Sequence, residues 1–299
     1  MVEKKPNFIV IGAMKSATTS IYTYLKKHPE IFMTKVKEPM FFNNFQQENN
    51  YKILGSKNKK PNTLEEYLKM FKDVKNEKAI GEASPAYIYN SKAPQLIKEH
   101  LSNVKIITIL RQPTDRAYSN YLHTKRADRE DASTFQEAIE LENKRIEDNW
   151  SPLYHYIEKG YYFVQLKRYY QLFPKENIRV YLFEDVVKKP QETLKDIFKF
   201  LEVDENVEID TSKKANVSGT PKGILGFILK KMRYYNFMPK FAISDYVPTF
   251  IISLLFKSVY KDPEKLDSVL RKELTDKYYR EEILKLEKLI DRDLSNWLS

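Results

Sequence analysis

Cysteine is absent from the 299 residues of the chain, so neither a disulfide bond nor a thiolate metal site can form. Histidine is scarce, and its few positions lack the paired spacing of residues that bind a metal together, which argues against a histidine-based metal site. These histidines are His28, His100, His123 and His155. No long apolar run follows the basic start of the chain, so we expect no secretory signal and a cytoplasmic protein.

Positive charge exceeds negative charge, with a formal net charge of +10 at pH 7. Such a surplus is compatible with a nucleic acid, a membrane surface or a small polyanion as the partner. The sequence contains no dense block of lysine and arginine, no zinc finger and no aromatic signature of an RNA-binding module. Nucleic acid is therefore not expected as the partner.

Short apolar segments alternate with amphipathic ones through the first two thirds of the chain. The apolar segments are typical of buried parallel strands, and they cover residues 8–11, 31–33, 78–81, 104–110 and 178–183. The amphipathic segments predict helices over residues 18–27, 63–74, 93–100, 114–126, 134–148, 161–173 and 192–201. This alternation predicts a three-layer α/β fold with a central parallel sheet flanked by helices. One domain of this kind can span all 299 residues.

The last quarter of the chain has a different composition. Residues 223–260 are apolar and basic, and prolines keep every apolar run below the ~20 residues that a membrane span needs. We expect an inserted helical lid or part of the core, with contact to an anionic membrane surface as the alternative. Residues 263–299 predict a C-terminal helical segment. Its apolar residues are expected to pack on the domain, and they are Leu284, Leu286, Leu289, Leu294 and Trp297.

The loop between the first strand and the first helix, residues 12–20, reads GAMKSATTS. Backbone N–H groups at the start of a helix point outward and carry partial positive charge, so they can bind an anion. Lys15 adds a full charge, while Ser16, Thr18 and Thr19 add hydroxyl donors. The phosphate loop of ATPases uses the same physics, but it has a second glycine that is missing here. An ordinary strand–helix turn with a capping hydroxyl is the alternative.

The string GAMKSATTSIYTYL resembles the 5′-phosphosulfate-binding loop of sulfotransferases that use 3′-phosphoadenosine-5′-phosphosulfate (PAPS). The similarity is to bacterial members and to the heparan-sulfate type, and it covers most of residues 7–220 and the tail 289–298. It implies a P-loop-like fold, PAPS as donor, adenosine 3′,5′-bisphosphate as product, and no metal. It also implies that Lys15 stabilises the leaving oxygen. The same pocket would be lined by Ser16, Ala17, Thr18, Thr19 and Ser20.

Other segments resemble the rest of the family's donor site. Arg111 follows the strand 104–110, and Ser119 comes eight residues later, as in the family's 3′-phosphate site. An arginine there can hold a phosphate with a forked, charge-assisted pair of hydrogen bonds. The resemblance also places Tyr181, Lys214 and Asn216 among the nucleotide contacts, the last two in a basic loop.

Two motifs resemble the acceptor side of the family's site. KEPMFF, residues 37–42, is similar to a stretch whose glutamate is the catalytic base, which implies that Glu38 takes the proton of the acceptor. His28 and His123 are the alternatives, because many other sulfotransferases use a histidine. GEASPAY, residues 81–87, resembles a segment beside the acceptor pocket. Several heparan-sulfate enzymes have lysine in place of Ala83, which weakens any inference of a heparan-like acceptor.

We therefore predict a sulfotransferase that transfers a sulfuryl group to a hydroxyl or amine of a glycan, a glycolipid or a small metabolite. A nucleotide-dependent kinase is the first alternative, but it would need an acidic residue after a strand to hold Mg²⁺, and strand 104–110 ends in Arg111. The second alternative is a non-catalytic basic protein that binds a membrane surface through residues 223–260.

Overall fold

The computed structural model describes residues 4–45, 60–101, 103–212, 220–221, 260–261 and 265–299. The chain forms two compact units, residues 1–215 with 266–299, and residues 216–265. In the smaller unit, β6 (Thr220–Pro221) pairs in antiparallel fashion with β7 (Tyr260–Lys261). The predicted insertion 223–260 lies outside the described residues except for Tyr260, so its role as a lid stays a prediction.

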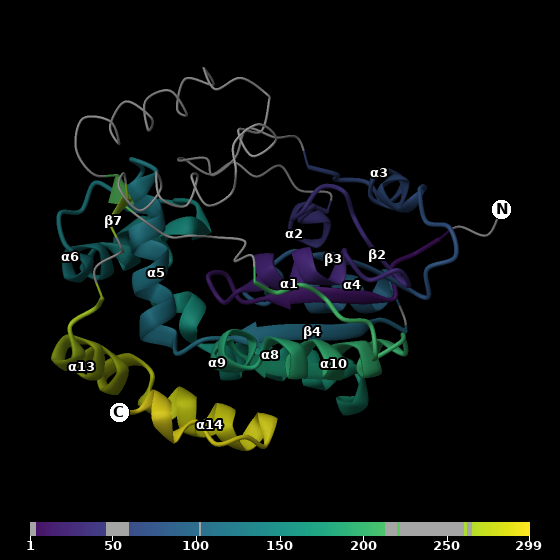
Figure 1. The fold of residues 1–299 in the computed structure, drawn as a ribbon. Coiled ribbons are helices and arrows are strands. Elements are labelled where there is room, and N and C mark those ends of the chain that lie inside the picture. The colour runs from purple at the N-terminus through teal and green to yellow at the C-terminus, as the bar shows by residue number, and fades with distance from the viewer. Residues whose placement is uncertain (1–3, 46–59, 102, 213–219, 222–259, 262–264) are drawn as a thin grey trace. The chain divides into compact units, whose positions relative to one another are not determined.

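The larger unit is built on a sheet of five parallel strands in the order β2-β3-β1-β4-β5 (Figure 1). The strands are β1 (Phe8–Gly12), β2 (Ile31–Met33), β3 (Ala79–Ala83), β4 (Lys105–Leu110) and β5 (Ile178–Leu182). The apolar runs in the sequence predict each of these strands, because a parallel sheet covered on both faces excludes water from both sides of a strand. The predicted α/β fold is confirmed.

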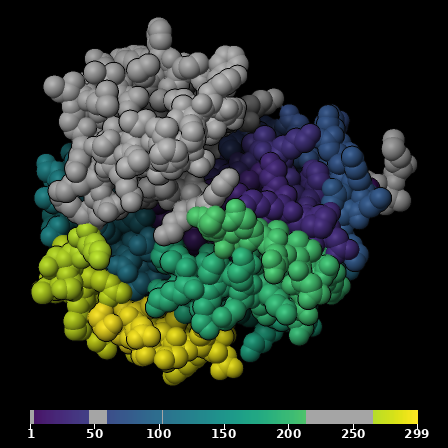
Figure 2. Space-filling view, viewed as in Figure 1, coloured from purple at the N-terminus to yellow at the C-terminus, as the bar shows by residue number. Residues whose placement is uncertain are grey.

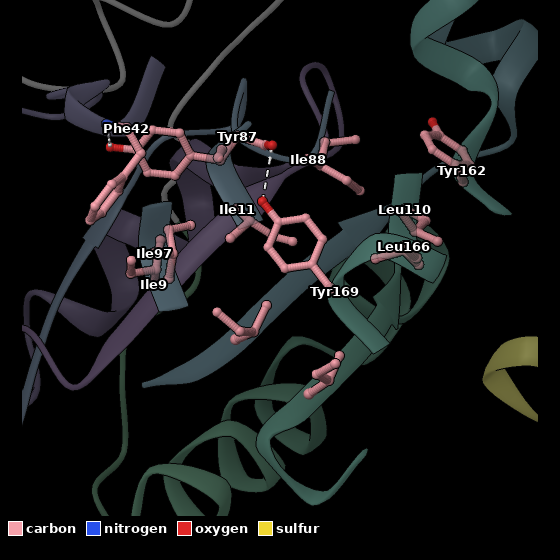
Figure 3. Packing of buried hydrophobic residues seen from close by; sticks show 14 of the residues in the cluster. Ile9, Ile11, Phe42, Tyr87, Ile88, Ile97, Leu110, Tyr162, Leu166 and Tyr169 are labelled. Atoms are coloured by element: carbon pink, nitrogen blue, oxygen red, sulfur yellow. Dashed lines mark hydrogen bonds between the residues drawn. The ribbon is translucent and has the colours of Figure 1, made fainter. Parts of the chain in front are cut away.

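Helices cover both faces of this sheet, as the alternation of side chains along β1 shows. Ile9 and Ile11 belong to one buried cluster, while Phe8 and Val10 belong to another on the opposite face. Figure 3 shows the first cluster, in which Leu166 comes from a helix packed on the sheet.

The helices of the larger unit connect and cover these strands. They are α1 (Thr18–Leu25), α2 (Phe41–Asn44), α3 (Leu64–Leu68), α4 (Ala93–His100), α5 (Pro113–Arg126), α6 (Phe135–Glu140), α7 (Glu142–Glu147), α8 (Tyr162–Leu172), α9 (Phe183–Lys188), α10 (Pro190–Leu201), α13 (Ser268–Tyr278) and α14 (Arg280–Ile290). None of the helices in these ranges is long and apolar enough to cross a membrane.

Two of the helices predicted from the sequence are shorter than expected. The helix expected over 134–148 is interrupted at Leu141, and the carboxylate of Glu142 then accepts the N–H groups of Ile157 and Glu158 at 2.7 and 2.9 Å. The helix expected over 63–74 ends at Leu68 and continues as a short 3₁₀ turn. In the first case a distant segment is tied to the side chain at the start of the second helix, a tertiary contact that the local pattern does not show.

The C-terminal helices pack on the larger unit as the sequence predicts. α14 packs on α8, and Figure 2 shows the yellow C-terminal segment against the teal one. Leu286, Leu294 and Trp297 are buried, and Leu289 is partly buried. The prediction for Leu284 is wrong, because 42% of this residue is exposed. It lies on the side of α14 that faces away from the core.

Candidate active site

The loop after β1 has the backbone geometry of an anion-binding site. Lys15 and Ala17 adopt left-handed conformations with φ of 67° and 65°, and alternation of this kind makes successive N–H groups converge. Within the part of the chain that the structure describes, no side chain caps the N-terminus of α1, which follows directly. The hydroxyl of Ser16 is buried and has no hydrogen-bond partner among the described residues. These observations favour an anion cradle over an ordinary capped turn.

Lys15 is the charged group of this cradle. Burial and, after it, the positive charges of Arg126 and Arg111 lower its pKa to about 8, while the carboxylate of Glu38 acts in the opposite direction. The free protein thus holds an ammonium group among other cations. A bound anion would relieve this repulsion.

Arg111 lies at the end of β4, the neighbour of β1 in the sheet. Its Nη1 donates to the backbone oxygen of Lys15 at 3.4 Å, and its guanidinium stacks 4.6 Å from the centre of the Phe183 ring. Burial lowers the pKa of Arg111. Ser119 is half-buried two turns into α5. The two motifs predicted for the two ends of the nucleotide therefore start from adjacent strand ends.

The turn after Arg111 is held by the C-terminal helices. The amide of Gln112 donates to the hydroxyl of Thr275 at 2.8 Å and to the backbone oxygen of Trp297 at 3.2 Å. Its oxygen accepts the N–H of Asp115 at 2.7 Å and so caps α5. The orientation of Arg111 thus depends on residues more than 160 positions further along the chain.

Glu38 lies between β2 and α2 with a left-handed φ of 60°. Its N–H donates to the backbone oxygen of Ala83 at 3.1 Å, and its carboxylate pairs with the ammonium of Lys37. Lys60 donates to its backbone oxygen. The side chain is 44% exposed, so it can reach a bound acceptor, and its charge acts on Lys15. The predicted base therefore lies within electrostatic range of the predicted donor loop.

The two histidines considered as alternative bases have different surroundings. His28 is buried, contacts the ring of Phe198, and bonds through Nε2 to the backbone oxygen of Asp204 at 2.9 Å, which indicates a structural role. Burial, which removes water from the imidazole, and then the positive charges of Lys15 and Arg126 lower the pKa of His123 to about 4. His123 is therefore neutral at pH 7 and a weak base.

One member of this site, Arg126, lies outside the motifs of the sequence. Arg126 acts on Lys15 and on His123 from the last turn of α5. Ser119, His123 and Arg126 are spaced i, i+4 and i+7, so they share one face of that helix. This spacing was the signal in the sequence that could have found it.

The remaining predicted nucleotide contacts have mixed outcomes. Thr18 is buried, while Ala17, Thr19 and Ser20 are half-buried at the start of α1. The hydroxyl of Tyr181 donates to the carboxylate of Asp196 at 2.7 Å, so it is engaged inside the domain, and its role as a nucleotide contact stays a prediction. Lys214 and Asn216 lie outside the described residues.

These residues fit a ligand with two anionic ends. The uncapped start of α1, the unpartnered hydroxyl of Ser16 and the repelling cations Lys15 and Arg111 all favour negative charge. The fold and this site define an α/β protein with groups that favour an anion at the carboxyl ends of adjacent parallel strands, the edge at which such folds bind their ligands.

Comparison with known proteins gives the family. Residues 5–251 match the model of the sulfotransferase domain, and the chain belongs to this family. The crystal structure of a sulfotransferase from Alicyclobacillus acidocaldarius superposes with a TM-score of 0.76 at 28% identity, over 99% of this chain and 100% of that one. The resemblance seen in the sequence is confirmed, and it leaves the kinase alternative without support.

Curated relatives include a protein named for membrane association and two named for heparan sulfate. The membrane-associated sulfotransferase kil1 of Dictyostelium discoideum is 40% identical over 119 residues, 39% of this chain and 22% of that protein. The mouse bifunctional heparan sulfate N-deacetylase/N-sulfotransferase 4 is 28% identical over 208 residues, 66% of this chain and 22% of that protein. The human heparan sulfate glucosamine 3-O-sulfotransferase 5 is 26% identical over 203 residues, 67% of this chain and 54% of that protein. The chain thus spans between 22% and 54% of the length of these relatives.

Proposed function

We propose that this domain transfers a sulfuryl group from PAPS to a hydroxyl or amine of an acceptor. The observation that carries the proposal is the contact between Arg111 and the backbone of Lys15, which unites the two predicted anion sites at neighbouring strand ends. Glu38 lies within electrostatic range of the same lysine. A cradle, a second cation and a carboxylate are the groups that sulfuryl transfer needs.

The donor would be held at both ends. Lys15, Ser16 and the N-terminus of α1 would bind its 5′-phosphosulfate, while Arg111 and Ser119 would bind its 3′-phosphate. When bound, PAPS supplies an activated sulfuryl group with a phosphate as the leaving group.

The residues of the chain would promote an in-line displacement at sulfur. Glu38 accepts the proton of the acceptor as the acceptor oxygen or nitrogen forms its bond to sulfur. Lys15 stabilises the negative charge that develops on the bridging oxygen as the old S–O bond breaks. The loop and Arg111 fix the donor in line with the acceptor, which supplies a large share of the rate through orientation alone.

A titration of the purified domain with adenosine 3′,5′-bisphosphate tests the donor assignment, followed by labelled PAPS with a panel of acceptors. We expect saturable heat and a rise in melting temperature, because a ligand that binds only the native state stabilises it. AMP, which lacks the 3′-phosphate, is the control and should bind more weakly. Equal binding of the two nucleotides, or none of either, would overturn the proposal.

The acceptor class proposed is a glycan, a glycolipid or a small metabolite with a free hydroxyl or amine. The names of the two heparan-sulfate relatives support a sugar acceptor, whereas Ala83 argues against a close copy of the heparan-sulfate site. Desulfated heparan sulfate, neutral oligosaccharides, glycolipid micelles and phenols should therefore be compared with labelled PAPS. Transfer to phenols alone would contradict a sugar acceptor.

As the alternative to a lid or part of the core, we also propose that residues 223–260 contact a membrane surface from the cytoplasmic side. The basic and apolar composition of this segment supports the proposal, as does the name of the Dictyostelium relative. Co-sedimentation with anionic vesicles should be lost when lysines and arginines of the segment are replaced by glutamine. Equal sedimentation of the two proteins would show that the segment makes no such contact.

Arg111→Ala should weaken the binding of adenosine 3′,5′-bisphosphate by about ten- to a hundredfold, because hydrogen bonds to charged groups contribute roughly 1.5–3 kcal/mol. Calorimetry measures the change. Arg111→Lys keeps the positive charge but cannot form the forked pair of hydrogen bonds to the phosphate, so an intermediate loss of affinity is expected. Unchanged affinity in the alanine variant would show that another residue holds the 3′-phosphate.

The affinity for the same nucleotide should fall by about tenfold as the pH rises from about 7 to about 9.5. Lys15 has a pKa lowered to about 8 in the free protein, so it is charged below that pH and loses its attraction for phosphate above it. Lys15→Met has no charge to lose there and should give a flatter profile. An equally steep profile in both proteins would assign the effect to another group.

A further inference from the structure

We infer that Glu82, a carboxylate buried at the end of β3, is a positioning residue that holds the loop of Glu38 in its reactive place. The inference rests on the proposed role of Glu38 as the base. It assigns a role to a residue of the GEASPAY motif that the proposed function leaves unused.

Glu82 is fully buried, with 0% of its surface exposed. The hydroxyl of Ser84 donates to its Oε2 at 2.8 Å, and the hydroxyl of Tyr67 donates to its Oε1 at 3.4 Å. Within the described ranges, no lysine or arginine forms an ion pair with this carboxylate. A buried carboxylate without a cation is unfavourable for stability, so its presence here calls for a role other than packing.

The hydrogen bonds lead from Glu82 to the loop of the proposed base. Because Ser84 gives its hydroxyl hydrogen to Glu82, its oxygen is free to accept the N–H of Met40, at 2.9 Å. The backbone oxygen of Ala83 accepts the N–H of Glu38 at 3.1 Å. Both contacts come from consecutive residues after Glu82, so the carboxylate fixes the segment that fixes the loop.

A neighbouring tyrosine adds a third contact, at the start of the helix that follows the loop. The N–H of Phe42 donates to the hydroxyl of Tyr87 at 3.4 Å, and Tyr169 in turn donates to the backbone oxygen of Tyr87 at 3.0 Å (Figure 3). Hydrogen bonds thus hold the loop at Glu38 and Met40 and the start of α2 at Phe42, at every second residue.

The loop needs this support because its backbone is unusual. Glu38 and Met40 both have left-handed backbone conformations, with φ of 60° and 56°, which residues other than glycine rarely adopt. Without the bonds from the β3 segment, the chain would return to commoner conformations and Glu38 would move. A displacement of about 1 Å is enough to lower turnover by about a hundredfold.

The charge of Glu82 links this support to pH. Burial raises its pKa to about 7, the charge of Glu38 acts in the same direction, and hydrogen bonds from hydroxyl groups oppose both. The titratable groups that face it are Tyr67 of α3, Tyr87 after β3, Tyr169 of α8, Lys60 and Glu38. Above about pH 7 Glu82 is ionised, and the carboxylate then accepts the hydroxyl hydrogens of Ser84 and Tyr67 more strongly, which tightens the support of the loop.

Glu82→Gln tests the inference, because it preserves shape and removes the charge. We expect kcat with PAPS to fall by about tenfold or more, KM for PAPS to stay within about twofold, and the rise of kcat near pH 7 to disappear. Ser84→Ala keeps the carboxylate and cuts the hydrogen-bonded link, so kcat should fall and the rise near pH 7 should become smaller. Glu65→Gln, on the exposed side of α3, is the control and should match the wild type.

Two failures can be told apart in the same set of assays. If Glu38→Gln is inactive while Glu82→Gln and Ser84→Ala have the kcat and pH profile of the wild type, Glu82 is not a positioning residue. If Glu38→Gln turns over normally, the proposed base is wrong, whatever Glu82 does. Should Glu82→Gln fail to fold, Ser84→Ala alone decides: a wild-type kcat overturns the inference.

Discussion

Lys15→Ala is expected to lower kcat with PAPS by about a hundred- to a thousandfold, the loss typical of removing one preorganised group that stabilises developing charge. The ammonium of Lys15 lies in the loop after β1, where burial and nearby cations make it unfavourable until an anion arrives. Its interaction should therefore strengthen most as the bridging oxygen becomes negative, which raises kcat more than it lowers KM. Steady-state assays with labelled PAPS at saturating acceptor measure both constants.

The matched control is a lysine of the same helix region outside the cradle. Lys26 is exposed after the last turn of α1, and Lys26→Ala should keep the turnover of the wild type. Lys15→Arg keeps a positive charge but changes its shape, so it should recover part of the loss. A kcat of Lys15→Ala within a few fold of the wild type would remove Lys15 from the transfer step.

Glu38→Gln is expected to lower kcat by about a hundred- to ten-thousandfold, the range that a positioned general base contributes. The affinity for adenosine 3′,5′-bisphosphate should stay unchanged, because the residues proposed to hold that nucleotide lie in the β1 loop and after β4. Glutamine preserves the size of the side chain, so the carboxylate that accepts the proton is the main loss. Rapid-quench assays separate this step from binding and product release.

The acceptor itself provides a second control for this variant. A phenol that is already ionised at the assay pH needs no base. The kcat of Glu38→Gln should therefore fall much less with such a phenol than with an alcohol as the acceptor. If His123→Ala loses turnover while Glu38→Gln keeps it, the base is the histidine. The low pKa of His123, about 4, argues against that outcome.

Motifs and patterns in the sequence were sufficient for the strands, the donor loop and the family. Apolar runs of β-branched residues predict buried parallel strands because both faces of such a sheet exclude water. The loop over residues 12–20 is local, so its contacts with an anion follow from neighbouring residues. For the same reason the sequence predicts that Lys15 and Arg111 each follow a strand. Glu38 was predicted by the resemblance of its motif to the family.

Contacts between distant segments were decided only by the tertiary structure. Arg111 meets the backbone of Lys15 across 96 positions because β1 and β4 are neighbours in the sheet, an order that no local pattern specifies. The burial of Glu82, like the exposure of Leu284, depends on which neighbours cover each face. A sequence specifies which residues can bind an anion or take a proton; packing determines which of them meet, how far water is excluded, and hence their charge.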